Sequence, residues 1–163
     1  LMTAQIANGG YKIYPKIVMD DENKVSPIDK FTPLYKNSKN IKIIQDAMFA
    51  STNEVRGTSY RSRIDDPKYQ FAGKTGTAQV KKITERDREL DLKTFQIPYE
   101  ERDHALYIAY GPYKNPRYAV SILVEHGGNG STTAAPMAKK LFKTIIDRHQ
   151  LRESINNKKY LDI

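Results

Sequence analysis

The stretch with the clearest chemical potential is residues 71–80, Phe-Ala-Gly-Lys-Thr-Gly-Thr-Ala-Gln-Val. It combines one cation, Lys74, with the hydroxyls of Thr75 and Thr77 around Gly76. Side chains on a strand alternate between faces, so the two threonines would share one face while Lys74 and Gly76 share the other. Two hydroxyls on one face, with an ammonium group behind them, are suited to bind a substrate carboxylate.

The backbone of the same stretch could also take part in a reaction. Gly76 leaves room for a neighbouring element or ligand to approach the strand closely. If Thr77 lies on a sheet edge, its amide can point at a developing oxyanion. The triplet Lys74-Thr75-Gly76 alone is also compatible with an edge strand whose lysine only prevents aggregation, so the rest of the chain must distinguish the two interpretations.

Composition indicates a globular domain without metal or thiol chemistry. The 163 residues are 39% hydrophobic and 28% charged, which allows one domain with a core and argues against disorder. The absence of cysteine excludes disulfides and thiolate chemistry. The three histidines, His104, His126 and His149, are scattered, so we expect no zinc site, no cofactor, and only structural or solvated histidines.

Positive charge is concentrated near the end of the sequence. The net charge is +8, and between Lys139 and Lys159 seven basic residues stand against two acidic ones. Such a segment could meet nucleic acid, phospholipid or a cell-wall polymer. It is more often the solvated face and end of a helix, where cations also suit the dipole. We favour the solvated helix and expect no nucleic-acid partner.

The first part of the chain must supply helices and connections. Residues 1–8 have helical composition and Gly9-Gly10 supplies a stop. No residue caps their start and eight residues are too few for an independent helix, so we expect the helix to begin upstream and the chain to be the tail of a longer one. Residues 11–18 read as a short extended piece interrupted by Pro15.

A second helix is predicted from Asn37 or Ser38 to about Thr52. Its apolar stripe contains Ile41, Ile44 and Met48 at helical spacing. The sequence Arg-Gly-Thr-Ser at 56–59 then breaks the helical pattern.

Two strands and a helix are predicted after the Lys74 strand. Residues 104–110 and 117–125 are apolar and joined by a turn-rich link, so they should form an antiparallel hairpin covered on both faces. A helix begins at residues 131–133 and covers one face through apolar positions at helical spacing: Ala134, Ala138, Leu141, Ile145 and Ile146. The other face has no evident cover in this chain. The fold class is therefore α/β, in the form of an α+β sandwich whose antiparallel sheet of three main strands is covered by a C-terminal helix.

The segment between the first two strands is an insertion of mixed charge. In residues 81–103, 13 of 23 residues are charged, and residues 84–92 have helical character. It could be a lid or a docking surface beside a site, or a solvated excursion, which we favour.

The order of these stretches resembles the C-terminal half of the transpeptidase domain of class B penicillin-binding proteins. The similarity is greatest to the elongation type, penicillin-binding protein 2, and extends from residue 1 to about residue 145. The segments that carry it are residues 4–10 with Pro15, 56–59, 71–79, 104–110, and 124–128 running into 131–137.

The resemblance implies a partial penicillin-binding-protein or β-lactamase-like fold and a serine D,D-transpeptidase that works through an acyl-enzyme. Its substrates would be peptidoglycan stem peptides ending in D-Ala-D-Ala, and β-lactams would acylate it. Lys74 would organise the site and favour the substrate carboxylate, which Thr75 and Thr77 would bind. The Thr77 amide would supply half of the oxyanion hole, and Gly76 would leave space for the helical lobe.

The sequence departs from the family pattern in one important respect. It contains no Ser-x-x-Lys. Ser51-Thr52-Asn53 has the Ser-x-Asn spacing but lies at a helix end, where serine and asparagine are ordinary, so we do not interpret it as catalytic. We therefore expect the nucleophile to lie outside this chain, and the chain alone to be inactive.

The resemblance also implies a domain organisation and a location. Residues 1–68 would be the helical and irregular part of a lobe, 69–150 the strands with their closing helix, and 151–163 a basic tail. The native protein would act at the extracytoplasmic, periplasmic face of the inner membrane, held by an upstream anchor, with membrane proteins of the elongation machinery as partners. The alternatives are a β-lactam-sensing or β-lactamase-like relative, and a non-catalytic basic interaction module.

Overall fold

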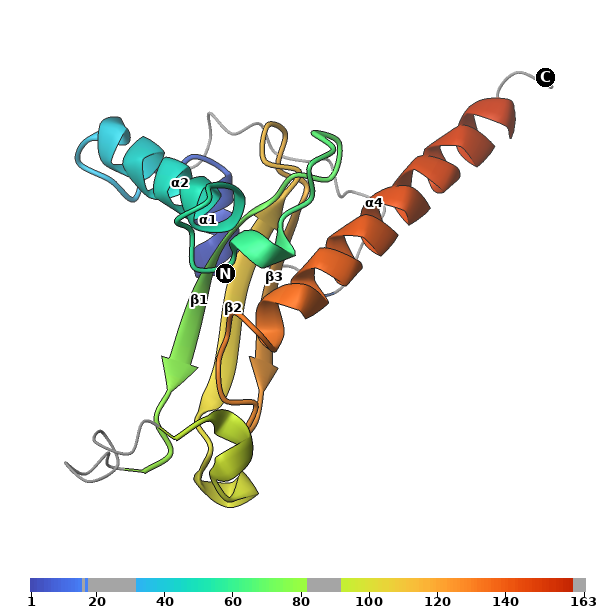
Figure 1. Cartoon of the computed structure of the whole chain (residues 1–163). Coiled ribbons are helices and arrows are strands. Elements are labelled where there is room, and N and C mark those ends of the chain that lie inside the picture. Colours follow the sequence, from blue (N-terminus) through green and yellow to red (C-terminus); the bar gives the residue numbers. More distant parts are fainter. Residues whose placement is uncertain (16, 18–31, 82–91, 160–163) are drawn as a thin grey trace.

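The computed structural model describes residues 1–15, 17, 32–81 and 92–159. Its strands form one small sheet, and its helices lie around that sheet (Figure 1). In chain order they are α1 (Met2–Ala7), α2 (Ser38–Asn53), η2 (Tyr60–Ser62), β1 (Ala72–Ala78), η3 (Thr94–Gln96), η4 (Tyr99–Glu101), β2 (His104–Gly111), β3 (Tyr118–Val124) and α4 (Ala134–Lys159). No helix among these described residues is both long and apolar enough to cross a membrane.

The sheet is antiparallel throughout, in the order β1-β2-β3. Thr75 of β1 lies opposite Tyr107 of β2, which lies opposite Ile122 of β3. The predicted hairpin and the mixed α/β class, a three-stranded antiparallel sheet with a C-terminal helix, are therefore confirmed. Strand β1 has one strand neighbour within the described residues, so its outer edge is not paired in the sheet.

Helix α4 covers one face of the sheet. Alternate β2 residues Ala105, Tyr107 and Ala109 are fully buried on this face, together with Phe71, whose ring stacks on Phe142 at 4.9 Å. The inward residues of α4 are Ala134, Ala135, Ala138, Phe142 and Ile146.

The predicted helix stripe was wrong at two positions. Leu141 remains 37% exposed and Ile145 is only half-buried, because the stripe continues from Ala138 in steps of four to Phe142 and Ile146. The helix continues to Lys159. Figure 1 shows this end of α4 projecting away from the sheet.

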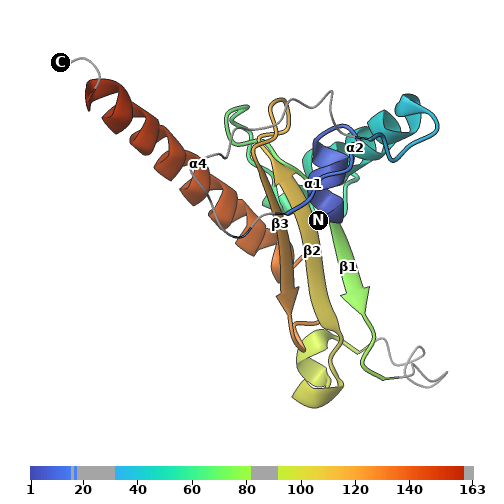
Figure 2. The ribbon, with the colours of Figure 1, turned by 180° about the vertical axis from the view of Figure 1, so that it is seen from behind.

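The opposite face has a partial cover, contrary to the sequence-based expectation. Met48 of α2 packs on Ala72 and Tyr110, with Ile6 of α1 beside them. In Figure 2 α1 lies over the upper part of the sheet, and the lower part of the strands extends beyond it. Leu123 in β3 is 57% exposed. The sequence missed this cover because α1 contributes few apolar residues and α2 packs mainly through its last turns.

Helix α2 has the predicted bounds, and its cap is local. The Asn37 side chain accepts a hydrogen bond from the Lys39 amide, which satisfies one of the otherwise unpaired amides of the first turn. Of the predicted stripe only Met48 is buried, and Ile44 is 42% exposed. The first turns of α2 extend past the sheet (Figure 1), and Ile41 there is only half-buried.

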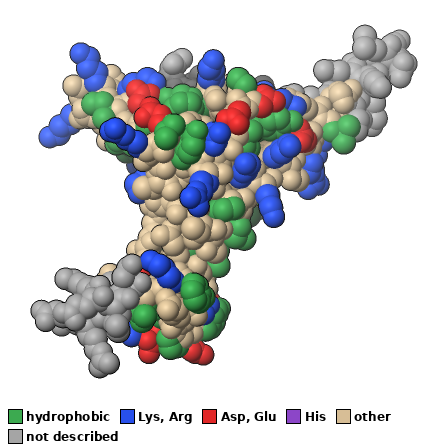
Figure 3. Space-filling model, viewed as in Figure 1, with side chains coloured by type: hydrophobic (Ala, Val, Ile, Leu, Met, Phe, Trp, Pro, Cys, Tyr) green, Lys and Arg blue, Asp and Glu red, His purple; other side chains and the backbone are tan. Residues whose placement is uncertain are grey.

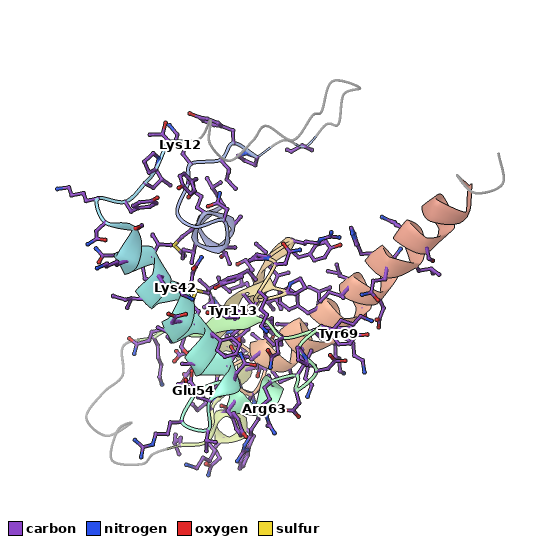
Figure 4. The ribbon with its side chains drawn as sticks, turned by 90° about the horizontal axis from the view of Figure 1, so that it is seen from above. Lys12, Lys42, Glu54, Arg63, Tyr69 and Tyr113 are labelled. Atoms are coloured by element: carbon purple, nitrogen blue, oxygen red, sulfur yellow. The ribbon has the colours of Figure 1, made fainter. Side chains whose placement is uncertain are left out.

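Two tyrosines tie the long helices to the loops around the sheet. Tyr113 donates to Asp46 of α2 at 2.7 Å, and Tyr69 donates to Asp147 of α4 (Figure 4). Lys42 and then Tyr113 lower the pKa of Asp46, and Tyr69 lowers that of Asp147. Both helices are thus held by exposed polar contacts as well as by the core.

Two sequence expectations concern segments with little described structure. Of the extended piece predicted at 11–18, the described residues show one isolated bridge, between Tyr11 and Pro33. The helix-like segment predicted at 84–92 lies outside the described residues, apart from Leu92.

Candidate functional site

Strand β1 presents the predicted site residues at the edge of the sheet. Lys74 and Thr77 are exposed, and Thr75 and Gly76 are half-buried. Residues opposite one another in an antiparallel ladder share a face. Thr75, opposite Tyr107, therefore lies on the α4 side, whereas Lys74, opposite Ile108, lies on the α2 side. The strand and its alternation are as predicted from the sequence.

Lys74 begins a line of polar groups that leads from β1 to α2. Its ammonium group donates to the Thr75 carbonyl oxygen at 2.9 Å and lies 3.3 Å from the Thr75 hydroxyl. The Thr75 hydroxyl lies 3.3 Å from that of Thr58, which lies 3.2 Å from that of Ser51. A cation beside a row of adjustable hydroxyl donors is an arrangement that can bind a carboxylate.

Sequence reasoning did not place Ser51 or Thr58 in the site. The available signal was Gly57, where a Cβ would overlap with the Ser51 carbonyl oxygen and lie 2.5 Å from that of Ala50. Only glycine lets the chain return this closely to the end of α2. The turn then places Thr58 beside Thr75.

A buried hydroxyl cluster lies behind this polar line. The Tyr107 hydroxyl contacts those of Thr52, at 2.9 Å, and Ser59, at 3.1 Å, and all three residues are fully buried or nearly so. Gly73 leaves space for it, since a Cβ there would overlap with the Tyr107 hydroxyl. Burial raises the pKa of Tyr107, so the phenol remains protonated and can donate. The cluster joins α2, the following turn and the sheet.

Replacing Tyr107 with phenylalanine is expected to cost about 1 kcal/mol of stability, because the buried Thr52 and Ser59 hydroxyls would each lose one hydrogen-bond partner while keeping a bond to a backbone carbonyl. Urea unfolding of the variant would measure the loss. Tyr14→Phe is the control, since Tyr14 is 71% exposed. Equal stability of the two variants would show that the cluster contributes nothing.

The Ser51-Thr52-Asn53 segment has three separate contacts. Ser51 belongs to the polar line and Thr52 to the buried cluster. The Asn53 amide donates to the carbonyl oxygens of Phe49, at 3.0 Å, and Phe71, at 2.9 Å. The last turn of α2 is therefore fastened to the residue just before β1.

A groove of about 550 Å³ runs beside Lys74, between α2 and β2. Its apolar lining includes Ile44, Ala47, Met48 and Ile108. The polar and charged residues of the lining are Ser51, Glu54, Arg56, Thr58 and Lys74. The exposed face of β1 thus borders open space and not a closed interior.

The histidines hold loops together in the structure. The His126 amide donates to the His104 Nδ1 at 2.9 Å, and the His126 Nδ1 lies 3.1 Å from the Arg102 carbonyl oxygen. His149 contacts Arg117. Within the described ranges, no group of three or more His, Cys, Asp or Glu side chains could hold a metal ion.

A known protein family matches most of the chain. Residues 2–146 match the family model described as the penicillin binding protein transpeptidase domain. The chain belongs to this family. The match covers the sheet with its Lys74 strand, α1, α2 and the first half of α4.

Relatives within the transpeptidase family are of the MrdA and PBP2 type. The chain is 39% identical over 101 residues to the peptidoglycan D,D-transpeptidase MrdA of Haemophilus influenzae, which covers 62% of this chain and 15% of that protein. It is 35% identical over 105 residues to MrdA of Salmonella typhimurium, and the match covers 64% of this chain and 16% of that protein. The chain thus spans about a sixth of the length of these relatives.

Solved transpeptidase structures show the same fold. PBP2 of Pseudomonas aeruginosa, in complex with WCK 5153, superimposes with a TM-score of 0.62 at 30% identity over 88% of this chain and 28% of that one. PBP2 of Helicobacter pylori, in complex with MreC, gives a TM-score of 0.56 at 29% identity over 76% of this chain and 20% of that one. The predicted resemblance to the PBP2-type transpeptidase domain is confirmed.

Proposed function

We propose that β1 forms one wall of the active site of a peptidoglycan D,D-transpeptidase that acts through an acyl-enzyme. The observation that carries the proposal is the polar line of Lys74, Thr75 and Thr58 on an exposed edge strand beside an open groove. Membership of the transpeptidase family supplies the reaction class.

Each site residue has a role that its chemistry supports. The Lys74 cation and the Thr75 and Thr77 hydroxyls bind the carboxylate of a D-Ala-D-Ala stem peptide or a β-lactam. The Thr77 amide is one donor to the oxyanion, since the outer edge of β1 has no strand partner among the described residues. Because Gly76 has no side chain, it leaves space beside the strand for the scissile bond.

The nucleophile comes from polypeptide outside these residues. The sequence has no Ser-x-x-Lys, the pattern in which a serine is activated by a nearby lysine. In this proposal the serine-bearing lobe lies against the groove beside Lys74, and the chain by itself binds but does not react. The complete enzyme would lie at the periplasmic face of the inner membrane, held by an upstream anchor.

The partner of such an enzyme would be a membrane protein of the elongation machinery. The support is the solved complex of Helicobacter pylori PBP2 with MreC. This chain resembles the PBP2 of that complex over 20% of its length. Peptidoglycan stem peptides and β-lactams would be its small ligands.

Incubation of the chain alone with a fluorescent penicillin is expected to give no covalent labelling. A longer protein that adds Ser-x-x-Lys and Ser-x-Asn segments upstream is expected to label, because it contains the serine. Gel fluorescence after denaturation distinguishes covalent from reversible binding, and prior treatment with unlabelled penicillin is the control. Specific labelling of any residue of this chain alone would overturn the division of roles.

A further inference from the structure

A second groove lies between the segment after α2 and the first turns of α4, on the α4 side of the sheet. Its volume is about 770 Å³, within the range of about 300–1,000 Å³ that is usual for ligand sites. Four cationic side chains line it: Arg61 from η2, and Lys139, Lys140 and Lys143 from α4. We call it the basic groove. Figure 3 shows Lys and Arg side chains gathered on this face of the molecule.

The helix geometry explains why the three lysines line one groove. Ala138 and Phe142 point into the core, and Lys139 and Lys143, four residues apart, project together from the flank beside them. Like charges at this spacing repel each other and destabilise a helix. An anionic ligand would relieve this repulsion.

The charge of the basic groove is not neutralised by the described part of the chain. No acidic residue belongs to its lining, and none of its four cations forms an ion pair with another described residue. Lys143 lies near enough to Asp147 to help lower the pKa of that carboxyl, but Asp147 is bound by Tyr69 and Lys68, outside the groove.

The lining between the cations is partly apolar. Val55, 78% exposed, lies on one wall with Tyr60, and Pro136 lies on the other. Hydroxyls of Ser62, Ser131 and Thr132 complete the surface. A chain that carries both carboxylates and apolar side chains would satisfy this mixture. A phosphate polymer would leave the apolar surface uncovered.

We propose that the basic groove binds an acidic segment of a partner protein, with its carboxylates on the four cations and apolar side chains against Val55, Tyr60 and Pro136. The groove shares Gly57 and Thr58 with the groove beside Lys74, and Thr58 contacts Thr75. A partner bound there would adjoin the site wall. The binding itself does not depend on the proposed transpeptidase activity.

The test is direct binding to the 163-residue chain, measured by fluorescence anisotropy at low salt. The probe is a short labelled peptide in which glutamates alternate with apolar residues, and the control peptide carries glutamine in place of glutamate. We expect the acidic peptide to bind and the glutamine peptide not to bind. Binding should weaken as salt rises, because the charges are exposed.

Substitutions on each wall locate the site. The triple variant Lys139→Gln, Lys140→Gln, Lys143→Gln is expected to bind at least about tenfold more weakly. Arg61→Gln, on the opposite wall, should weaken binding by about two- to fivefold. The charge-matched control is Lys36→Gln, Lys39→Gln, Lys114→Gln, which removes three exposed cations outside the groove and should leave binding nearly unchanged.

Several results would overturn the proposal. Equal weakening by the charge-matched control would mean that only net charge matters, and an unaffected Arg61→Gln variant would mean that the groove is not the site. Tighter binding of polyphosphate or of a DNA oligonucleotide would indicate a phosphate site. Displacement of the probe by a neutral peptide ending in D-Ala-D-Ala would assign the groove to the substrate instead.

Discussion

Replacing Lys74 with alanine is expected to lower the rate of β-lactam acylation by about 10²-fold in a protein that joins this chain to a serine-bearing lobe. The Lys74 ammonium group is the only cation in the polar line on β1 among the described residues, and it lies 3.3 Å from the Thr75 hydroxyl. Its loss removes the charge that holds a substrate carboxylate against the strand. Because Lys74 is exposed, the fold should lose little stability.

The second-order rate of labelling by a fluorescent penicillin measures this effect. Lys39→Ala is the matched control, since Lys39 is an exposed lysine at the start of α2, away from β1. Urea unfolding of both variants separates a loss of chemistry from a loss of folding. Wild-type acylation by a folded Lys74→Ala protein would contradict the proposed role of this cation.

Local sequence patterns were sufficient to predict the elements that carry the site. The strand at Ala72–Ala78 and the hairpin from His104 to Val124 depend on strand alternation and on turn residues adjacent in sequence. The capped start of α2 at Asn37 is equally local. Each of these elements forms because of interactions between residues that are close in sequence, so the local sequence is enough to predict them.

Packing between distant segments was predicted less well. Phe142 and Leu141 are both apolar neighbours on a helix, and only the position of the sheet determines that Phe142 is buried and Leu141 is not. Thr52 is polar, and its complete burial follows from the partner hydroxyl of Tyr107, 55 residues away. The spacing of apolar residues along the helix does not by itself predict either the burial of Phe142 in place of Leu141 or the burial of Thr52.

The candidate site shows the same limit. Lys74 and Thr75 were found because they are adjacent on one strand. Thr58 was not, because its contact with Thr75 spans 17 residues and depends on the turn at Gly57. The basic groove likewise joins η2 to α4. Sequence spacing therefore identifies the strand, and only the fold adds the turn and the groove beside it.

A single methyl group added at a glycine between the sheet and α4 is expected to destabilise the fold strongly. Gly130 is buried, and a Cβ there would lie 2.5 Å from the Leu106 carbonyl oxygen and 2.7 Å from that of Gly76. Both neighbours are strand backbone and cannot rotate away. The Gly130 carbonyl also accepts from the amides of Ala134 and Ala135, so its displacement would disturb the start of α4.

Gly130→Ala should therefore cost about 3 kcal/mol of stability, at the upper end of overpacking effects. The fall in the urea midpoint at constant slope would measure it. In the longer protein it should also slow acylation, since the methyl group would push on the backbone of Gly76. Gly76→Ala is the matched control for stability, because its Cβ would meet only the Leu106 Cβ, at 3.3 Å, and should cost less than about 1 kcal/mol. Equal stability of the two variants would mean that the segment before α4 does not pack on the site strand, and the wall formed by β1 would then lack its support from behind.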